Sequence, residues 1–164
     1  GAIQAVDGEL ELRFDPLWAL ASDAAPSTGL SFLVRGSWVR GHADALINGA
    51  RQSDDLRRAP PAQIAFTLRW EEPESSWLWA EVETELVREQ RRLSVDDKSD
   101  TQRIPGRGSP GYALWHLRVG VRLAEERLKL SAALENVFDR DYRVHGSGTN
   151  GPGRRLTFAL EATW

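Results

Sequence analysis

The side chains that most often carry chemistry are few and scattered in this sequence. The three histidines, His42, His116 and His145, lie far apart, and none has a neighbouring pattern of metal ligands. The acidic run at 96–100 lacks the glycine and the final glutamate of an EF-hand loop, so we expect a solvated loop there. The glycine-rich stretch 146–153 lacks the Gly-Lys-Ser/Thr ending of a phosphate-binding loop. We therefore expect no enzymatic activity, no metal site and no cofactor.

Charged side chains instead recur at every second position of several segments. Glu81, Glu83 and Glu85 form one such row, and the positions between them are apolar. Alternation with a period of two places the charged residues on one face of a β-strand and the apolar residues on the other. The net charge of −3, with both signs interspersed, is unlike the basic surface of a nucleic-acid-binding protein.

The alternation predicts seven strands and no helix. The clearest strand runs from 113 to 123, and the others lie near 3–14, 30–38, 62–70, 78–86, 128–134 and 153–164. A two-residue turn at Glu125 and Glu126 would pair Leu123 with Leu128 and match every apolar residue across the hairpin. The same register sets Arg122 opposite Lys129, a like-charge pair that needs water or a nearby carboxylate.

The predicted connections alternate in length. Those at 71–76 and 124–127 are short, and those at 42–59, 96–110 and 139–153 are long and rich in Gly, Asp, Arg, Ser and Pro. The linker at 15–28 is longer than a tight turn and departs mildly from this rule. No run of even fifteen uninterrupted apolar residues is present, which argues against a membrane-spanning helix. Short turns on one side and long loops on the other are typical of an outer-membrane β-barrel.

Alternation alone is also compatible with a soluble β-sandwich or a lipocalin-like barrel, whose apolar face points inward. The tryptophans favour the membrane: Trp70, Trp77 and Trp164 lie at the short-turn side, and Trp38 and Trp115 lie toward the long-loop side. Indole rings prefer the two membrane interfaces. In a barrel, the expected lipid-facing residues are Leu117, Val119, Val121, Leu130, Ala132, Phe158 and Leu160, and the expected lumen-facing residues are Arg69, Glu81, Glu83, Glu85, Arg118 and Arg122.

Motifs near the C-terminus resemble those of TonB-dependent outer-membrane receptors. The segment 134–143 (LENVFDRDYR) resembles the ENLFDRDYR segment of that family, and 145–154 (HGSGTNGPGR) resembles the loop that follows it. Ser109-Pro110-Gly111-Tyr112 is similar to the family's TPGY strand start, and Trp164 stands where the family ends in an aromatic residue. Val137 replaces the usual Leu, and Gly151 stands where an acidic residue is common. The resemblance is specific over the last 55 residues, and earlier residues match only in strand rhythm.

The resemblance implies that residues 1–164 form the C-terminal part of a barrel of about 22 strands in the bacterial outer membrane. It implies active uptake of a scarce nutrient such as a siderophore-iron complex or cobalamin, with an N-terminal plug domain and a TonB box outside this sequence. The implied partners are outer-membrane lipid and lipopolysaccharide, the barrel-assembly machinery, the inner-membrane TonB complex and a small-molecule ligand. A passive porin, an adhesin-like barrel or a soluble β-sandwich binding module are the alternatives.

Two further sets of residues follow from this interpretation. Phe158 and Trp164, on the terminal strand, resemble the signal read by the barrel-assembly machinery. Candidate ligand contacts lie in or beside the last long loop. The alternative is that these residues shape the loop and pair with lipopolysaccharide or with neighbouring carboxylates. The candidate contacts are Arg143, His145, Asn150, Arg154 and Arg155. The sequence does not identify the transported ligand. We also expect two unpaired sheet edges, near 3–14 and at 153–164, so that the isolated chain should aggregate edge to edge.

Overall fold

The chain forms one antiparallel β-sheet with folded loops at one end, in a computed structural model that describes residues 1–14, 28–47 and 49–164. Within these residues lie eight strands and one short helix. The elements are β1 (Ala2–Phe14), β2 (Leu30–Ile47), β3 (Ala50–Asp55), β4 (Gln63–Glu71), β5 (Leu78–Val87), α1 (Val95–Ser99), β6 (Tyr112–Leu123), β7 (Leu128–Glu135) and β8 (Arg155–Ala162). The all-β antiparallel class predicted from the alternation is confirmed.

The strands are ordered β1-β2-β4-β5-β6-β7-β8 in the sheet, and β3 pairs with β2 off this path. Neighbouring strands are therefore consecutive in the sequence, except that β3 comes between β2 and β4. The predicted register of the β6–β7 hairpin is confirmed: Leu123 pairs with Leu128, and Arg122 pairs with Lys129. Consistent register across β4, β5 and β6 keeps the apolar residues on one face and the charged residues on the other. We call these the apolar face and the ionic face.

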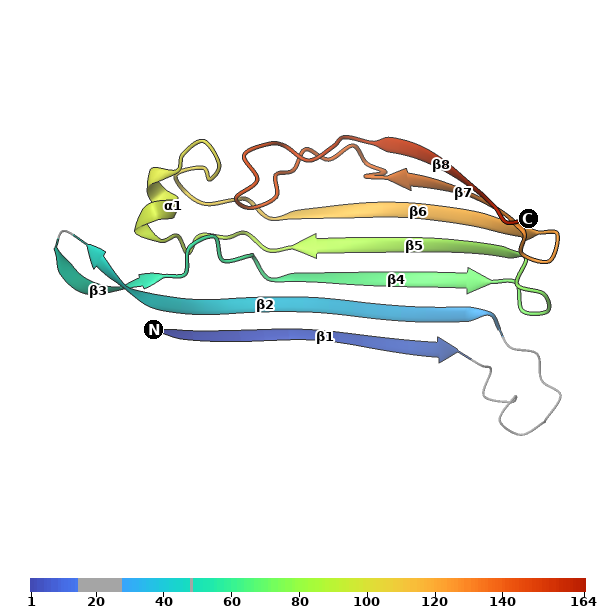
Figure 1. Cartoon of the computed structure of the whole chain (residues 1–164), viewed down its shortest axis with the longest axis horizontal. Helices are drawn as coiled ribbons and strands as arrows, with labels where there is room; N and C mark the ends of the chain where they lie inside the picture. Colours follow the sequence, from blue (N-terminus) through green and yellow to red (C-terminus); the bar gives the residue numbers. More distant parts are fainter. Residues whose placement is uncertain (15–27, 48) are drawn as a thin grey trace.

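The two ends of the sheet differ as predicted. Figure 1 shows the connections β4–β5 and β6–β7 at one end, together with the C-terminus, and the longer connections at the other end with the N-terminus. β8 is an edge strand that runs from the long-loop end to the short-turn end, as expected. β1 is the other edge of the described sheet. The predicted linker at 15–28 falls almost wholly on residues 15–27, outside the described residues.

Residues 42–59 were predicted to be a loop, and this prediction is wrong. β2 continues to Ile47 and pairs with β3, so that a hairpin arm extends beyond the rest of the sheet. The arm carries polar side chains such as Asp44, Gln52 and Asp54, which removes the alternation that marks a strand with one apolar face. Backbone hydrogen bonds between β2 and β3 do not require that alternation. The strand count therefore rises from the predicted seven to eight within the described residues.

The expectation of no helix is also wrong over a short stretch. Ser94 caps α1 by accepting a hydrogen bond from the backbone N–H of Asp97, and the Asp97 carboxylate accepts one from the backbone N–H of Ser94. This reciprocal arrangement is a capping box, and its sequence pattern, Ser-x-x-Asp, is present at 94–97. Asp97, one of the acidic residues at 96–100, therefore stabilises the start of α1.

The turn between β6 and β7 confirms the predicted two-residue connection. Arg127 N–H donates to Ala124 O at 3.1 Å, and the central residues Glu125 and Glu126 have φ of 57° and 68°. Positive φ at both central positions is the signature of a type I′ turn, which usually selects Asn-Gly. The matched apolar residues of the two strands therefore determine the register, and the turn residues adopt an unfavourable backbone conformation.

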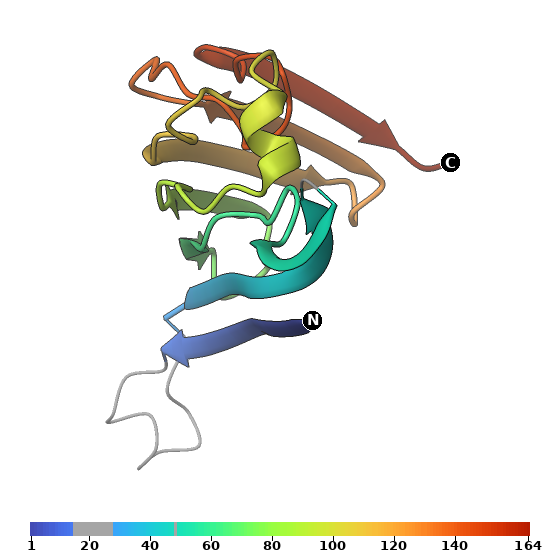
Figure 2. The ribbon, with the colours of Figure 1, turned by 90° about the vertical axis from the view of Figure 1, so that its left-hand side faces the viewer.

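The two faces differ in exposure. On the apolar face, Leu117, Val119 and Phe158 are 41%, 44% and 74% exposed. On the ionic face, the side chains of Glu83 and Glu81 are only 12% and 15% exposed. The strands follow an arc when seen along their length (Figure 2), and no described element covers the apolar face. A soluble sandwich or lipocalin-like barrel would bury these apolar residues, so this arrangement argues against both.

Candidate functional site

The ionic face carries a continuous network of arginine and glutamate side chains across β2, β4, β5 and β6. Glu81 lies 2.6 Å from Arg118 and 3.4 Å from Arg69. Glu83 also contacts Arg118, at 3.3 Å, and contacts Arg35 of β2 at 2.8 Å. Each of these two carboxylates bridges two guanidinium groups, so two of the three like charges in the β5 row are neutralised by neighbouring strands. The sequence-predicted residues Arg69, Glu81, Glu83 and Arg118 are brought together here.

The network continues toward the short-turn end through Glu71. Its carboxylate lies 3.1 Å from Arg69 and 2.7 Å from Arg122, which also donates to the carbonyl oxygen of Ser76. The positive charge of Arg122 is thereby neutralised, although Lys129 lies opposite it. Lys129 itself pairs with Glu161 of β8 at 3.3 Å. Carboxylates on β4 and β8 therefore offset the like-charge pair Arg122–Lys129, as the sequence required.

Glu85 differs from the other two glutamates of its row. It lies on the ionic face, opposite Ala65 and Leu114, but has no arginine or lysine within ion-pair distance among the described residues. The charge pattern of the sequence predicts that each carboxylate of the row lies within reach of an arginine or lysine on an adjacent strand, and this prediction is wrong for Glu85. The cause is the register, because apolar residues occupy the cross-strand positions next to Glu85.

A tryptophan on the ionic face was not assigned any role from the sequence. The guanidinium of Arg69 lies 4.3 Å from the centre of the Trp79 ring, in cation–π geometry. The ring also lies against Gly120, where the Cβ atom of any larger residue would meet ring atoms at 2.6 Å. Gly120 is therefore needed for space: a side chain there would displace Trp79 and, with it, the Arg69 end of the ion-pair network.

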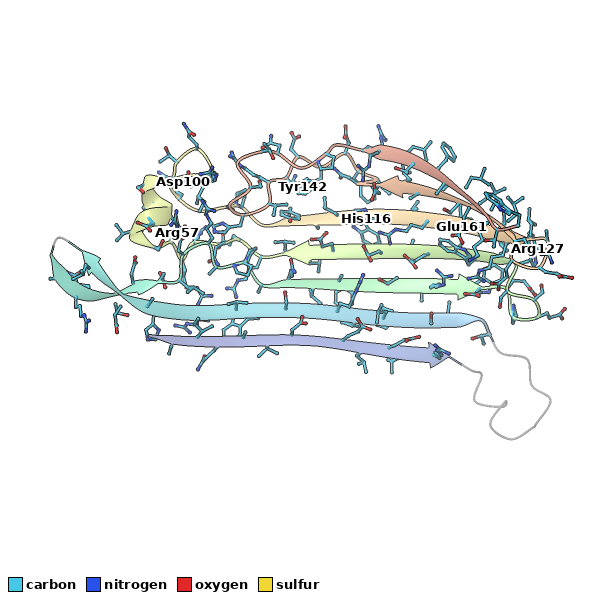
Figure 3. All side chains as sticks on the ribbon, viewed as in Figure 1. Arg57, Asp100, His116, Arg127, Tyr142 and Glu161 are labelled. Atoms are coloured by element: carbon cyan, nitrogen blue, oxygen red, sulfur yellow. The ribbon has the colours of Figure 1, made fainter. Side chains whose placement is uncertain are left out.

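The loops at the long-loop end form a compact cap with its own core. Its fully or nearly buried apolar residues are Ala59, from the connection between β3 and β4, and Leu93 and Ile104, from the connection between β5 and β6. Gln90 lies among them, donates to the carbonyl oxygen of Ala59 at 2.9 Å, and pairs through its backbone with Ser109. Figure 3 shows side chains of this region, including Asp100 and Tyr142, from two different loops. The cap consequently holds the loops in a defined arrangement.

Two of the buried polar side chains in the cap, those of Asp97 and Asn136, organise it. Asp97, 1% exposed, accepts hydrogen bonds from the backbone N–H groups of Arg58 and Ser94. It therefore ties α1 to the connection between β3 and β4. The neighbouring Asp100 accepts hydrogen bonds from Arg103 and Arg58, and the hydrogen bond from Arg103 is the main reason that its pKa lies below its ordinary value.

Asn136 is the second buried organiser, at 3% exposure. Its side-chain amide donates to the carbonyl oxygens of Arg140 and Pro152 at 2.9 and 3.1 Å, and its side-chain oxygen accepts from the Arg140 N–H at 2.8 Å. These three bonds hold the start and the end of the last long loop together. Asn136 belongs to the LENVFDRDYR segment, so the motif that resembles a known family has a clear structural role.

The five candidate ligand contacts do not form one site. Arg143 and His145 turn into the cap, where Arg143 donates to the carbonyl oxygen of Gln102 and His145 Nδ1 lies 2.9 Å from the Ser109 hydroxyl. Arg155 pairs with Glu135 through Nε at 2.7 Å, on the ionic face of the β7–β8 pair. Arg154 is fixed through its backbone N–H, which donates to Asp139, and Asn150 is exposed. Arg143, His145 and Arg155 thus already have partners within the chain.

Burial lowers the pKa of His145, and the nearby Asp97 opposes this effect only in part. The folded cap therefore holds a neutral ring, whereas an opened loop binds a proton at the ordinary pKa of about 6.5. The contribution of His145 to the stability of the cap is therefore complete above about pH 6.5. It should be lost as the pH falls toward the lower pKa that His145 has in the folded cap. We expect amide hydrogen exchange in residues 142–151 to accelerate below about pH 6.5, after correction for intrinsic rates.

The control for this prediction is His145→Asn, which should remove most of the pH dependence in that segment. Residues 128–134 of β7 should show little change over the same range. An acceleration of equal size in the variant would assign the effect to another group.

The described residues contain no helix that is long and apolar enough to cross a membrane. The same residues contain no group of three or more His, Asp or Glu side chains placed to hold a metal ion. A hollow of about 510 Å³ on the apolar face lies over Ala80 and Ala132 between larger aliphatic residues. It shares none of the candidate ligand contacts.

Comparison with solved structures finds a similar fold in the copper transporter OprC, with a TM-score of 0.71 and 19% sequence identity. The match covers 99% of this chain and 24% of that chain, so the chain spans about a quarter of the transporter's length. No family model and no curated protein matches the sequence. At this identity the likeness establishes the fold: the chain adopts the same sheet as a part of that larger protein.

Proposed function

We propose that this chain is the C-terminal part of the barrel of a TonB-dependent outer-membrane receptor, which imports a scarce nutrient. The observation that carries the proposal is the pair of unlike faces: an uncovered apolar face suited to lipid, and an ionic face whose charges are paired for a polar lumen. The fold shared with part of a transporter and the C-terminal motifs support it. The chain itself catalyses no reaction in this proposal.

Open edges support the view that the chain is one part of a larger barrel. Within the described residues, β1 and β8 each pair on one side only. An unpaired edge in hydrocarbon leaves backbone N–H and C=O groups without partners, which costs several kcal/mol for each group. Further strands must therefore lie between β8 and β1 in the closed barrel. Phe158 and Trp164 on the last strand are proposed to serve recognition by the barrel-assembly machinery.

The test compares uptake in cells with and without a functional inner-membrane TonB complex. The probes are a ferric chelate, cobalamin and copper(II), each radiolabelled, and the gene is expressed in full. The proposal expects one probe to enter only in cells that have the complex, and a plug domain to be encoded upstream. Uptake that is equal in both strains would identify a passive porin, and uptake of none of the probes without an encoded plug would favour an adhesin-like barrel.

A further inference from the structure

Four arginines gather beside one tryptophan at the long-loop end of the sheet. Arg40 lies on β2, and Arg88, Arg91 and Arg92 follow the end of β5. Together with Trp38 they line a shallow hollow of about 470 Å³. We call this group the arginine patch. All four arginines are exposed to solvent, so their charges are available to an external partner.

The patch lies directly beyond the border of the apolar face. Along β2 the apolar positions run from Leu30 to Trp38, and Arg40 occupies the next position on that face. Along β5 the last apolar residue on that face is Leu86, and Arg88 follows it. Arg88 N–H donates to the carbonyl oxygen of Ala62 at 2.9 Å, which holds the end of β5 beside the segment that leads into β4.

The apolar face has a suitable height for a membrane. Leu30 to Trp38 spans about 27 Å at roughly 3.4 Å per residue, or about 20 Å for a strand tilted by about 40°. Outer-membrane barrels have an outward apolar band of about 25 Å. The arginine patch therefore lies at the level of lipid headgroups, with Trp38 in the interfacial position that indole rings prefer.

The charge of the patch is only partly compensated within the described residues, and Glu89 is the one carboxylate that lines the hollow with the arginines. Arg91 pairs with Glu89 at 2.9 Å, but Arg40, Arg88 and Arg92 have no ion pair there. Arginines of the neighbouring cap behave differently: Arg57 pairs with Asp96, and Arg103 pairs with Asp100. Three uncompensated guanidinium groups around one hollow create a local positive charge that favours an anion.

We propose that the arginine patch binds the phosphate groups of an anionic glycolipid in the outer leaflet. The inference rests on the proposed function, because the long loops mark the outer side of such a barrel. Guanidinium groups recognise phosphate through paired, charge-assisted hydrogen bonds. The acyl chains of the same lipid would lie along the apolar face below Trp38. The lipid is therefore a structural partner at the barrel surface and separate from the imported nutrient.

The test measures how much bisphosphorylated lipid A the complete barrel retains in detergent after delipidating washes. The variant is R40Q/R88Q/R92Q, and the matched control is R51Q/R127Q/R140Q, which removes three exposed arginines outside the patch. The patch variant should bind on the order of 100-fold more weakly, because each basic residue near an anionic surface contributes about a fivefold factor. The control should bind like the unchanged protein.

Two further arms complete the test. Dephosphorylated lipid A should bind equally weakly to all three proteins, and millimolar inorganic phosphate should not displace the intact lipid. Equal retention by the patch variant and the control would overturn the inference, and so would full displacement by inorganic phosphate. Insertion of each protein into bilayers is measured in parallel. A barrel that inserts but shows no patch effect contradicts this inference alone, whereas a protein that does not insert contradicts the proposed function as well.

Discussion

Replacing Val119 by arginine should destabilise the inserted barrel by about 2–4 kcal/mol, the cost of a basic residue on the lipid face near the bilayer midplane. Val119 lies in the middle of β6, on the apolar face, with Ala80 and Ala132 as its cross-strand neighbours. These small neighbours offer the guanidinium no carboxylate partner. The measurement is a denaturant titration of the full-length protein folded into lipid vesicles.

The matched control for Val119→Arg is Thr157→Arg on β8. Thr157 pairs with Ala133 and lies on the ionic face, so an arginine there should cost well under about 1 kcal/mol in a polar lumen. A similar loss of stability from both substitutions would show that the two faces meet the same environment. That outcome would refute the assignment of the apolar face to lipid.

The second large effect is expected for Asn136→Ala. The substitution removes three side-chain hydrogen bonds and leaves the carbonyl oxygens of Arg140 and Pro152 and the N–H of Arg140 without these partners. An unsatisfied buried polar group costs about 1–3 kcal/mol, so the last long loop should lose about 2–4 kcal/mol of local stability. Hydrogen exchange should report faster opening of residues 136–154.

Asn150→Ala provides the comparison, because Asn150 is exposed in the same loop. Its effect on loop stability should remain within about 0.5 kcal/mol. If both asparagine variants leave hydrogen exchange unchanged, the buried amide of Asn136 does not hold the loop. If Asn150→Ala weakens binding of the imported ligand without changing exchange, Asn150 is a ligand contact.

The sequence predicted the strands of the sheet well because one face is apolar and the other is charged. Leu123 and Leu128 pair as expected, since a shift by one residue would exchange the two faces. The hairpin arm formed by β2 and β3 was missed for the same reason. Residues 51–55 of β3 are all polar and residues 45–47 of β2 are all apolar, so neither strand shows an alternating pattern there. The pairing depends on backbone hydrogen bonds, which the sequence pattern does not reveal.

The candidate site was harder to predict because it depends on cross-strand partners. The row of Glu81, Glu83 and Glu85 was visible, yet only the register shows that Glu85 lacks an arginine. The role of Asp97 depends on a loop distant in the sequence, whereas the role of Asn136 depends on how the start and the end of its own loop meet. A capping pattern at Ser94–Asp97 was readable, but burial of that carboxylate against the Arg58 backbone was not.

The orientation of the sheet in a membrane can be measured most directly with spin labels along β7. The chain has no cysteine, so a single cysteine at each position from 128 to 134 can be labelled specifically within it. The full-length protein is reconstituted into vesicles, and collisions of each label with oxygen and with a water-soluble nickel chelate are compared. Oxygen accessibility should peak at Leu130 and Ala132, and nickel accessibility should peak at Ser131 and Ala133. Equal nickel accessibility at all positions, or the opposite phase, would contradict the assignment of the apolar face to lipid.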